Sequence, residues 1–413
     1  MSAVRIALGI SMVWITAALI VVMLLYPQPI LQAALTGVGI WWDVLFPALF
    51  PFFIITELLL SYGIVHFFGT LLDPLMRPLF RVPGIGGFVM AMGFASGYPV
   101  GARLTSQLYD QKLVNSEEGE RLVAFTSTSD PIFLIGAVSI GFFHSVEIAL
   151  ILGLAHYSTG ILIGLLMRFY ARKQAMTPAS GEQEGSLLLR AFRNMHRARL
   201  EHHRPFGEML QEAALTALRL IFVIGGLVVF FSVLIEVLTQ TKILQSLGEG
   251  ISRILHTSGM PGELADAFIN GLFEVTLGAK AAGAADADLL YRAAAAAFIL
   301  SWAGLSVHAQ IISLMSHTGM RYLPFLLARL LHGVLAMGMV FLLWHAAGPD
   351  AAIFQSWAQR LTPVVSLNPG SLASKLPHTL FLISAVFLMM LVVLSLAVHG
   401  MRRIYQLIGK SRL

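Results

Sequence analysis

Cysteine is absent from this sequence of 413 residues, which excludes disulfides, thiolate metal sites and a cysteine nucleophile. Charged residues are also scarce, at 12% of the chain, whereas soluble domains contain about a quarter. Hydrophobic residues make up 57%, and the mean hydropathy is +0.79. The sequence therefore predicts an integral membrane protein.

Enzyme signatures are missing as well. The sequence contains no G-x-S-x-G, no H-E-x-x-H and no phosphate-cradling glycine loop. The net charge of +5 comes mainly from basic residues at the edges of apolar segments, where membrane proteins place them. We therefore expect no enzymatic activity, no nucleic-acid partner, and no metal or other cofactor.

Eight apolar segments reach the roughly 20 residues that are needed to cross the core of a lipid bilayer. These predicted spans are residues 6–25, 38–62, 119–144, 146–169, 209–238, 289–318, 322–347 and 378–400. The first span is longer than the apolar region of a signal peptide, and no clear cleavage site follows it. We therefore expect it to be retained.

Two stretches rich in basic residues set the predicted orientation. Residues 168–204 hold eight Lys and Arg against three acids, and the tail from Arg402 to Arg412 holds four without an acid. The positive-inside rule places both in the cytoplasm. We therefore expect a multi-pass protein of the cell membrane with both termini cytoplasmic.

The stretch AMGFASGYPVGARLTSQLY, residues 91–109, does not suit a simple membrane helix. Pro99 removes a hydrogen-bond donor and disfavours the α conformation for Tyr98, so a helix should break there. Broken backbone at membrane depth is tolerated only where protein or a wet cavity surrounds it. We therefore predict a re-entrant hairpin over 84–110 that enters from the cytoplasm and forms half of a transport site.

The two halves of the chain echo each other. Pro51–Glu57 resembles Phe230–Glu236. Farther along, Gly101–Arg103 resembles Gly278–Lys280 in the same order. The predicted topology makes the halves antiparallel, and inverted repeats with interrupted segments point to a secondary-transporter site near the bilayer midplane. A second hairpin is then expected over 263–285, entering from outside, unless glycine-rich apolar chains resemble each other by chance.

The predicted fold is an all-α polytopic membrane protein with about eight spans and two re-entrant hairpins in an inverted repeat. Each repeat contains a hairpin followed by a broken helix, over 119–144 in the first and 289–318 in the second. The predicted segments are an N-terminal transmembrane helix (1–36), a first repeat (37–169), a basic cytoplasmic loop (170–207), a second repeat (208–347), and an outer loop, last transmembrane helix and basic tail (348–413).

The first broken helix contains Thr126-Ser-Thr-Ser-Asp-Pro131, a polar run that is expensive inside an apolar span unless it faces a cavity. Pro131 frees the carbonyl of Ser127, and carbonyl and hydroxyl oxygens suit Na⁺, while Asp130 could bind a cation or carry a proton. The alternative is a kinked helix whose hydroxyls bond their own backbone. The candidates for a coupling-ion site are Thr126, Ser127, Thr128, Ser129 and Asp130.

Polar residues of both hairpins and of the second broken helix are candidates for binding a small-molecule substrate. Glu274 is the strongest acidic candidate, because a carboxylate at this depth is costly unless it is paired or useful. Packing is the alternative role for His308. The substrate-binding candidates are Ser96, Gly97, Tyr98, Arg103, Asn270, Glu274, Thr276, Lys280, Ser301, Ser306, His308 and Gln310.

Arg103 and Lys280 stand at equivalent positions of the repeat, each in the second half of its hairpin. The N-terminus of a half-helix already favours anions. The two cations therefore predict a paired anion site with approximate two-fold symmetry. Alternatively, Glu57 and Glu236, which are equally matched, neutralise them.

Several motifs resemble the YlbJ family of sporulation integral membrane proteins, which contain the nucleoside-recognition gate domain twice. The matching pieces are Trp41–Phe53, Gly93–Arg103 and Phe125–Pro131, with weaker ones at Gly271–Glu274 and Gly304–His308. The resemblance covers most of residues 37–340. Asp130 stands where the family pattern suggests Asn.

This resemblance implies a fold like the core of concentrative nucleoside transporters, with the substrate between two hairpins and two broken helices. For sporulation members it implies movement of dipicolinic acid, an aromatic dicarboxylate, from mother cell toward forespore, in the mother-cell or outer forespore membrane. We further expect its two carboxylates to suit the Arg103 and Lys280 pair. Nucleoside transport and a non-transporting scaffold are the alternatives. Coupling to Na⁺, to H⁺ or to neither stays open, and related transporters suggest a homo-oligomer.

Overall fold

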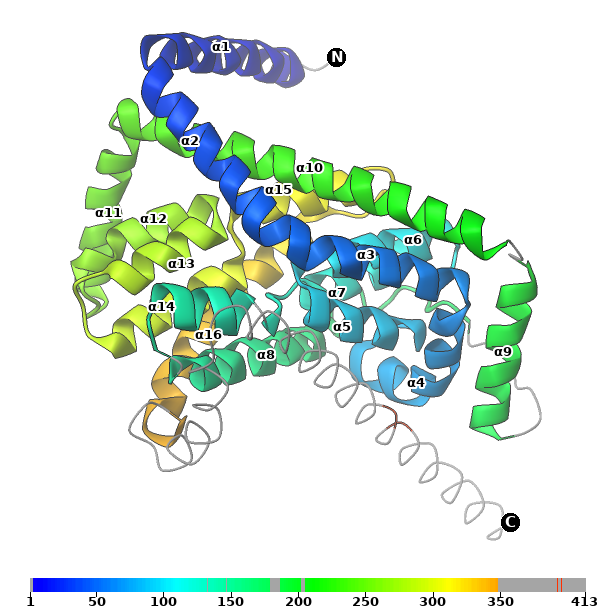
Figure 1. Cartoon of the computed structure of the whole chain (residues 1–413). Coiled ribbons are helices and arrows are strands. Elements are labelled where there is room, and N and C mark those ends of the chain that lie inside the picture. Colours follow the sequence, from blue (N-terminus) through cyan, green and yellow to red (C-terminus); the bar gives the residue numbers. More distant parts are fainter. Residues whose placement is uncertain are drawn as a thin grey trace.

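The computed structural model describes residues 3–131, 133–145, 147–178, 186–201 and 205–347, together with Val392 and Ser395 (Figure 1). The predicted outer loop, most of the predicted last span and the basic tail lie outside the described residues, as does part of the basic loop. Within the described residues every regular element is a helix and no strand is present. The all-α prediction is confirmed.

The helices follow one another along the chain in two sets. The first half contains α1 (Ala3–Leu25), α2 (Pro27–Gly39), the π-helix η1 (Ile40–Leu45), α3 (Phe46–Ser61), α4 (Ile64–Phe80), α5 (Ile85–Ser96), α6 (Tyr98–Asp110), α7 (Ser116–Thr126), the π-helix η2 (Phe133–Phe142) and α8 (Ile148–Met167). The second half contains α9 (Leu187–Glu201), α10 (Phe206–Gln240), α11 (Ile243–Thr257), the 3₁₀ turn η3 (Gly262–Leu264), α12 (Ala265–Phe273), α13 (Val275–Ala284), α14 (Leu289–Trp302), α15 (Gly304–Met315) and α16 (Tyr322–Ala347).

Four segments of the described chain are long and apolar enough to cross a bilayer: α8, α10, α14 with α15, and α16. Two bent pairs raise the number to six, namely α1 with α2, bent by 104°, and α3 with α4, bent by 92°. The span 119–144, predicted as a broken helix, is divided into α7, a non-helical segment and η2, because Pro131 and the hydroxyl-rich run before it interrupt the helix.

The first hairpin consists of α5 and α6, which pack against each other and break at Gly97, where the sequence predicts a break. Gly97 has a φ of 90° and a ψ of −176°, a conformation that essentially only glycine adopts. Pro99 lies in the first turn of α6, where its missing N–H leaves no hydrogen bond unmade. Nearly all of α5 is buried, so this hairpin is surrounded by protein.

The second hairpin consists of α12 and α13, which break at Glu274 in an extended conformation (φ −142°, ψ 125°). Its two helices touch through glycines. A Cβ atom on Gly278 would lie 2.2 Å from the Cα of Gly271, so the helices pack more closely than any side chain would allow. The amphipathic helices α4 and α11 precede the first and second hairpins in the chain.

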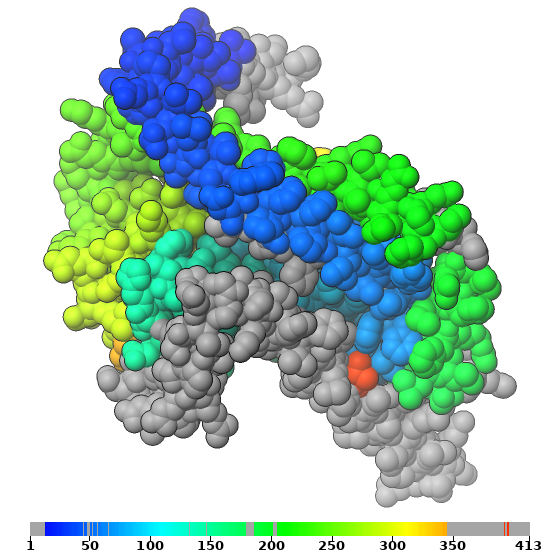
Figure 2. Space-filling model, in the orientation of Figure 1, coloured from blue at the N-terminus to red at the C-terminus, as the bar shows by residue number. Residues whose placement is uncertain are grey.

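The helix α14 lies in the interior, where it packs against α16 and α8. Apolar side chains on outer helices are exposed instead, among them Leu24 of α1, Phe222 of α10 and Leu342 of α16. Figure 2 shows α1 to α3 in blue and α10 in green across one face of the molecule. Exposed apolar surface on this scale suits contact with lipid, as expected of an integral membrane protein.

Candidate functional site

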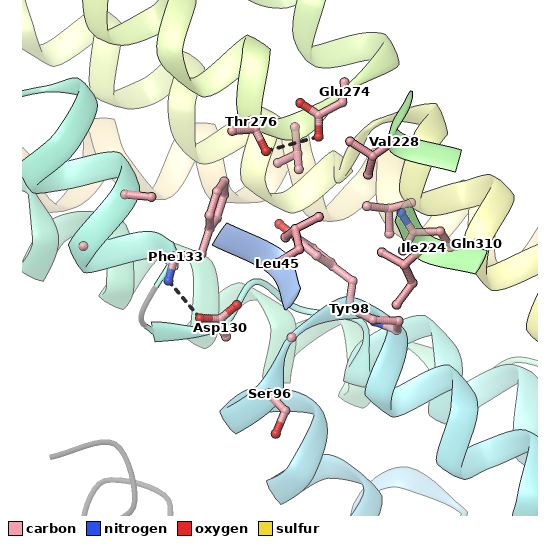
Figure 3. Close-up of a pocket in the computed structure, with 16 residues that line it drawn as sticks. Leu45, Ser96, Tyr98, Asp130, Phe133, Ile224, Val228, Glu274, Thr276 and Gln310 are labelled. Atoms are coloured by element: carbon pink, nitrogen blue, oxygen red, sulfur yellow. Dashed lines mark hydrogen bonds between the residues drawn. The ribbon is translucent and has the colours of Figure 1, made fainter. Parts of the chain in front are cut away.

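A cavity of about 230 Å³ lies where the two hairpins meet η2, α10 and α15; we call it the central cavity (Figure 3). Most of its wall is apolar, with contributions from Leu45, Ile224 and Val228. A mainly apolar pocket with a few convergent polar groups is typical of a small-molecule site. Seven of the predicted residues line it: Ser96, Gly97, Tyr98, Asp130, Glu274, Thr276 and Gln310.

The tip of the first hairpin lies directly against Asp130. A Cβ atom on Gly97 would be 3.1 Å from Oδ2 of Asp130, so glycine allows this approach. The Oδ1 atom of Asp130 accepts the N–H of Phe133 at 2.8 Å and thereby caps the helical segment after the break. The Tyr98 hydroxyl donates to the carbonyl of Leu300 at 2.7 Å, which links the first hairpin to α14.

Glu274 forms the tip of the second hairpin and is 3% exposed. Its Oε2 atom accepts the N–H of Leu277 at 2.8 Å, so the carboxylate caps α13. The hydroxyl of Thr276 donates to Oε1 at 3.2 Å. These hydrogen bonds, and the helix dipole at the N-terminus of α13, offset part of the cost of burying a carboxyl group at this position.

Asp130 and Glu274 approach the central cavity from different walls (Figure 3). Lysine and arginine are missing from the described residues that line it. Two carboxylates in a weakly polar surrounding repel an anionic ligand unless protons are present on the carboxylates or on the ligand. The cavity therefore offers hydrogen-bond acceptors and aromatic surface, the latter from Tyr98 and Phe133.

The predicted paired anion site is not formed around this cavity. The guanidinium of Arg103 lies 3.4 Å from Oε1 of Glu57, and the Gln107 amide donates to the same carboxylate at 2.9 and 3.0 Å. Lys280 is exposed. Each cation lies six residues beyond its hairpin break, which is about 9 Å along a helix. The structure therefore shows the predicted alternative for Arg103, which is neutralisation by Glu57.

Four of the five predicted coupling-ion residues are buried, Asp130 is partly buried, and three of the hydroxyls bond nearby main-chain carbonyls. The Thr126 hydroxyl donates to the carbonyl of Leu122 at 2.7 Å, and the Ser127 hydroxyl donates to that of Val123 at 2.8 Å. The Thr128 hydroxyl reaches the carbonyl of Gly93 at 3.4 Å. These hydroxyls therefore satisfy backbone around the break, and among the predicted coupling-ion residues Asp130 is the one that lines the central cavity.

The remaining candidates lie off the central cavity. Asn270 donates to the carbonyl of Asp266 at 2.8 Å, one turn back in its own helix. The ring of His308 lies 2.7 Å from the Tyr322 hydroxyl and 3.0 Å from the carbonyl of Trp302, so its contacts fit a packing role. Ser301 and Ser306 are buried and are also not among the cavity's lining residues.

Comparison with known proteins places this arrangement in a family. The family model Gate, described as nucleoside recognition, matches residues 43–173 and 221–321. The sporulation integral membrane protein YlbJ of Bacillus subtilis (strain 168) is 40% identical over 326 residues, which are 77% of this chain and 78% of that protein. The chain belongs to the gate family. No solved structure matches it.

Two residues that are not among the candidates predicted from the sequence join two helix breaks of this gate-family chain. One break lies between α7 and η2, and the other lies between α14 and α15, at Ala303. His156 of α8 accepts the N–H of Ser129 at Nε2, at 3.0 Å, which leaves Nδ1 to donate to the Ser301 hydroxyl at 2.8 Å. Arg329 of α16 donates to the carbonyls of Ser127 and Ser301. Both are ionisable residues inside apolar helices, a signal that marks functional candidates by default.

A second polar contact joins α7 to the start of α16 in the gate-family fold. The N–H and guanidinium of Arg321 donate to the Glu120 carboxylate at 2.7 to 3.1 Å. The hydroxyl of Tyr170, just beyond α8, donates to the same carboxylate at 2.6 Å. Burial, and then the bond to Glu120, raises the pKa of Tyr170 to about 12, so its phenol stays protonated at physiological pH.

Proposed function

We propose that this protein is a membrane transporter that moves a small aromatic solute through the central cavity, by alternating access between its two repeats. The observation that carries the proposal is the position of the cavity, at the tips of both hairpins and beside the interruption between α7 and η2. Secondary transporters bind their substrates at such interrupted helices near the bilayer midplane. The solute is moved without chemical change, and the proposed partners of the protein are this small molecule and the lipid bilayer.

Dipicolinate is the solute that we favour. The 40% identical relative is a sporulation protein by name, and dipicolinic acid is the solute that the family resemblance implies. Tyr98 and Phe133 would flank its ring, and Gln310 would donate to a carboxylate. Because Asp130 and Glu274 also line the cavity, the proposal requires protons to accompany the dianion. Movement toward the forespore is therefore proposed to be coupled to H⁺.

The test is uptake of labelled dipicolinate by proteoliposomes that contain the purified protein. The proposal expects uptake above that of empty liposomes, and faster uptake when the external pH is lowered, because binding of the dianion requires protons. The control is the same liposome preparation after an ionophore has dissipated the proton gradient. Absence of uptake at every gradient, with the protein shown to be folded and inserted, would leave a scaffold role as the better account.

Nucleoside transport is the second candidate. Two carboxylates without a lining Lys or Arg, within the described part of the wall, suit the hydroxyl and N–H donors of a neutral nucleoside. The family description, nucleoside recognition, points the same way. Uptake of labelled nucleoside decides between the two: it should stay at the level of empty liposomes under our proposal, whereas nucleoside uptake without dipicolinate uptake would identify the nucleoside as the substrate.

A further inference from the structure

Arg329 lies at the crossing of the two broken helices. It belongs to α16 and is 0% exposed. One terminal nitrogen donates to the carbonyls of Ser127 and Ser301, the latter at 3.2 Å, and the other donates to the carbonyl of Ala124 at 2.7 Å. It follows both ranges that match the gate family model, which end at residues 173 and 321.

The three carbonyls share one property: each lies at the C-terminal end of a helix that is interrupted within the protein. Ala124 and Ser127 lie at the end of α7, and Ser301 lies at the end of α14. The last carbonyls of a helix lack partners within it and carry the negative end of its dipole. Two such ends pointing to one spot form a site for a cation.

In secondary transporters, unwound carbonyls and the C-terminal ends of half-helices are the groups that coordinate a coupling Na⁺. Here the planar guanidinium takes that place. Arginine stays charged at any physiological pH, and its fixed fork of donors can reach several carbonyls at once. A cation at membrane depth is costly unless such groups surround it. Both terminal nitrogens of the Arg329 guanidinium therefore bond the carbonyls that would otherwise face a cation.

His156 strengthens the same junction from another helix. It bonds the main-chain N–H of Ser129 at one break and the Ser301 hydroxyl at the other. The main-chain oxygen of Ser129 accepts the Tyr157 hydroxyl at 3.0 Å. Carbonyl oxygens of Ser127 and Ser129, from the run expected to bind Na⁺, are thus already engaged by protein donors.

We propose that the guanidinium of Arg329 is a tethered cation that fills the position of a coupling Na⁺ between the two helix breaks. Two consequences follow. Folding of the protein needs no Na⁺, and solute movement is independent of a Na⁺ gradient. The second consequence rests on the proposed function, whereas the first does not.

The test compares thermal unfolding of the purified protein in sodium chloride and in choline chloride at equal ionic strength. The wild-type Tm should be the same in both salts. The Arg329→Ala variant should unfold several degrees lower in choline, and Na⁺ or methylguanidinium should restore part of the loss, because a ligand that binds the folded state raises Tm. Lys280→Ala is the control, since it removes an exposed cation that lies outside this junction; its Tm should not respond to Na⁺.

Two results would overturn the proposal: a wild-type Tm that rises with Na⁺, or an Arg329→Ala variant whose Tm responds to neither Na⁺ nor methylguanidinium. If Arg329→Ala does not fold, two measurements still test the proposal. One is the Tm of the wild type in the two salts, and the other is the Tm of the Arg329→Lys variant, which keeps the charge and should remain insensitive to Na⁺. Uptake is measured in parallel with and without a Na⁺ gradient. Loss of uptake under all conditions would count against the transport function, while the unfolding measurements still test the tethered cation.

Discussion

The two hairpins reach one cavity, but their tips are built differently. The first tip has almost no side chain: Gly97 turns the chain in a conformation reserved for glycine, and Pro99 starts the next helix. The second tip is an ordinary extended residue, Glu274, whose own carboxylate caps the next helix. The first turn depends on backbone conformation, and the second depends on a charged side chain.

The two tips therefore contribute differently to the cavity: the first contributes the shape of the backbone, and the second contributes a carboxyl group. Because Gly97 leaves room for Asp130, the first tip determines how closely the hairpin approaches the broken helix. The second tip brings a nearly buried carboxylate to the cavity wall. We therefore expect substitutions at the first tip to lower stability, and substitutions at the second tip to lower transport while the fold is retained.

The largest effect is expected for Glu274→Gln. The amide oxygen can still cap α13, so the protein should fold, but the variant can no longer bind and release a proton there. Loss of one charged hydrogen bond to the bound solute should cost about 1.5–3 kcal/mol of binding free energy. This corresponds to a fall in uptake of roughly tenfold or more. The measurement is the initial rate of dipicolinate uptake under an inward proton gradient.

Glu57→Gln provides the matched control for this prediction. Glu57 is a carboxylate of the same length that bonds Arg103 and Gln107 away from the central cavity, so its uptake should stay within about twofold of wild type. Unchanged proton-driven uptake by Glu274→Gln would show that the two tips do not differ in function.

A smaller loss is expected for Gly97→Ala, and it should appear in stability. A Cβ atom there is strained by the backbone, at a cost of about 1–3 kcal/mol, and it presses on Asp130. Gly153→Ala in α8 is the control, because nothing lies within 4 Å of the added Cβ atom; it should be neutral or slightly stabilising. Equal Tm values for Gly97→Ala and wild type would contradict the dependence of the first tip on backbone conformation.

The smallest effects are expected for Arg103→Gln and Lys280→Gln. The Arg103–Glu57 pair is partly exposed, so its loss should cost less than about 1 kcal/mol. Lys280 is exposed, and its substitution should leave Tm unchanged. Uptake by both variants should be close to that of wild type. A folded Lys280→Gln or Arg103→Gln protein that no longer accumulates dipicolinate would restore the paired anion site as the binding site.

The local features of the fold could be predicted from the sequence because they depend on neighbouring residues. Pro99, two residues after Gly97, predicts the break at Gly97, and the hydroxyl-rich run before Pro131 predicts the interruption of the first broken helix. Glu274 and Asp130 stand out since carboxylates are rare in apolar segments. Each of these signals lies within a few residues of the feature that it predicts.

The rest depends on contacts between distant parts of the chain. Equivalence of Arg103 and Lys280 in the repeat does not determine which way their side chains point, and both lie too far past the breaks to reach the cavity. The bond between Arg329 and Ser127 joins residues 202 positions apart, and that between His156 and Ser301 joins residues 145 apart. The rarity of charge in an apolar helix is a signal that could have marked Arg329 as a candidate, but the sequence pattern cannot identify its partners.

The alanine run of α14 has a consequence for how hydropathy is read in this protein. Ala293–Ala297 are all 0% exposed, and five consecutive residues cover every face of a helix. The span that contains α14 is 78% buried, whereas that of α16 is 33% buried. The apolar character of the alanine run therefore reflects close packing against other helices, and reading it as contact with lipid would be wrong for this stretch of α14.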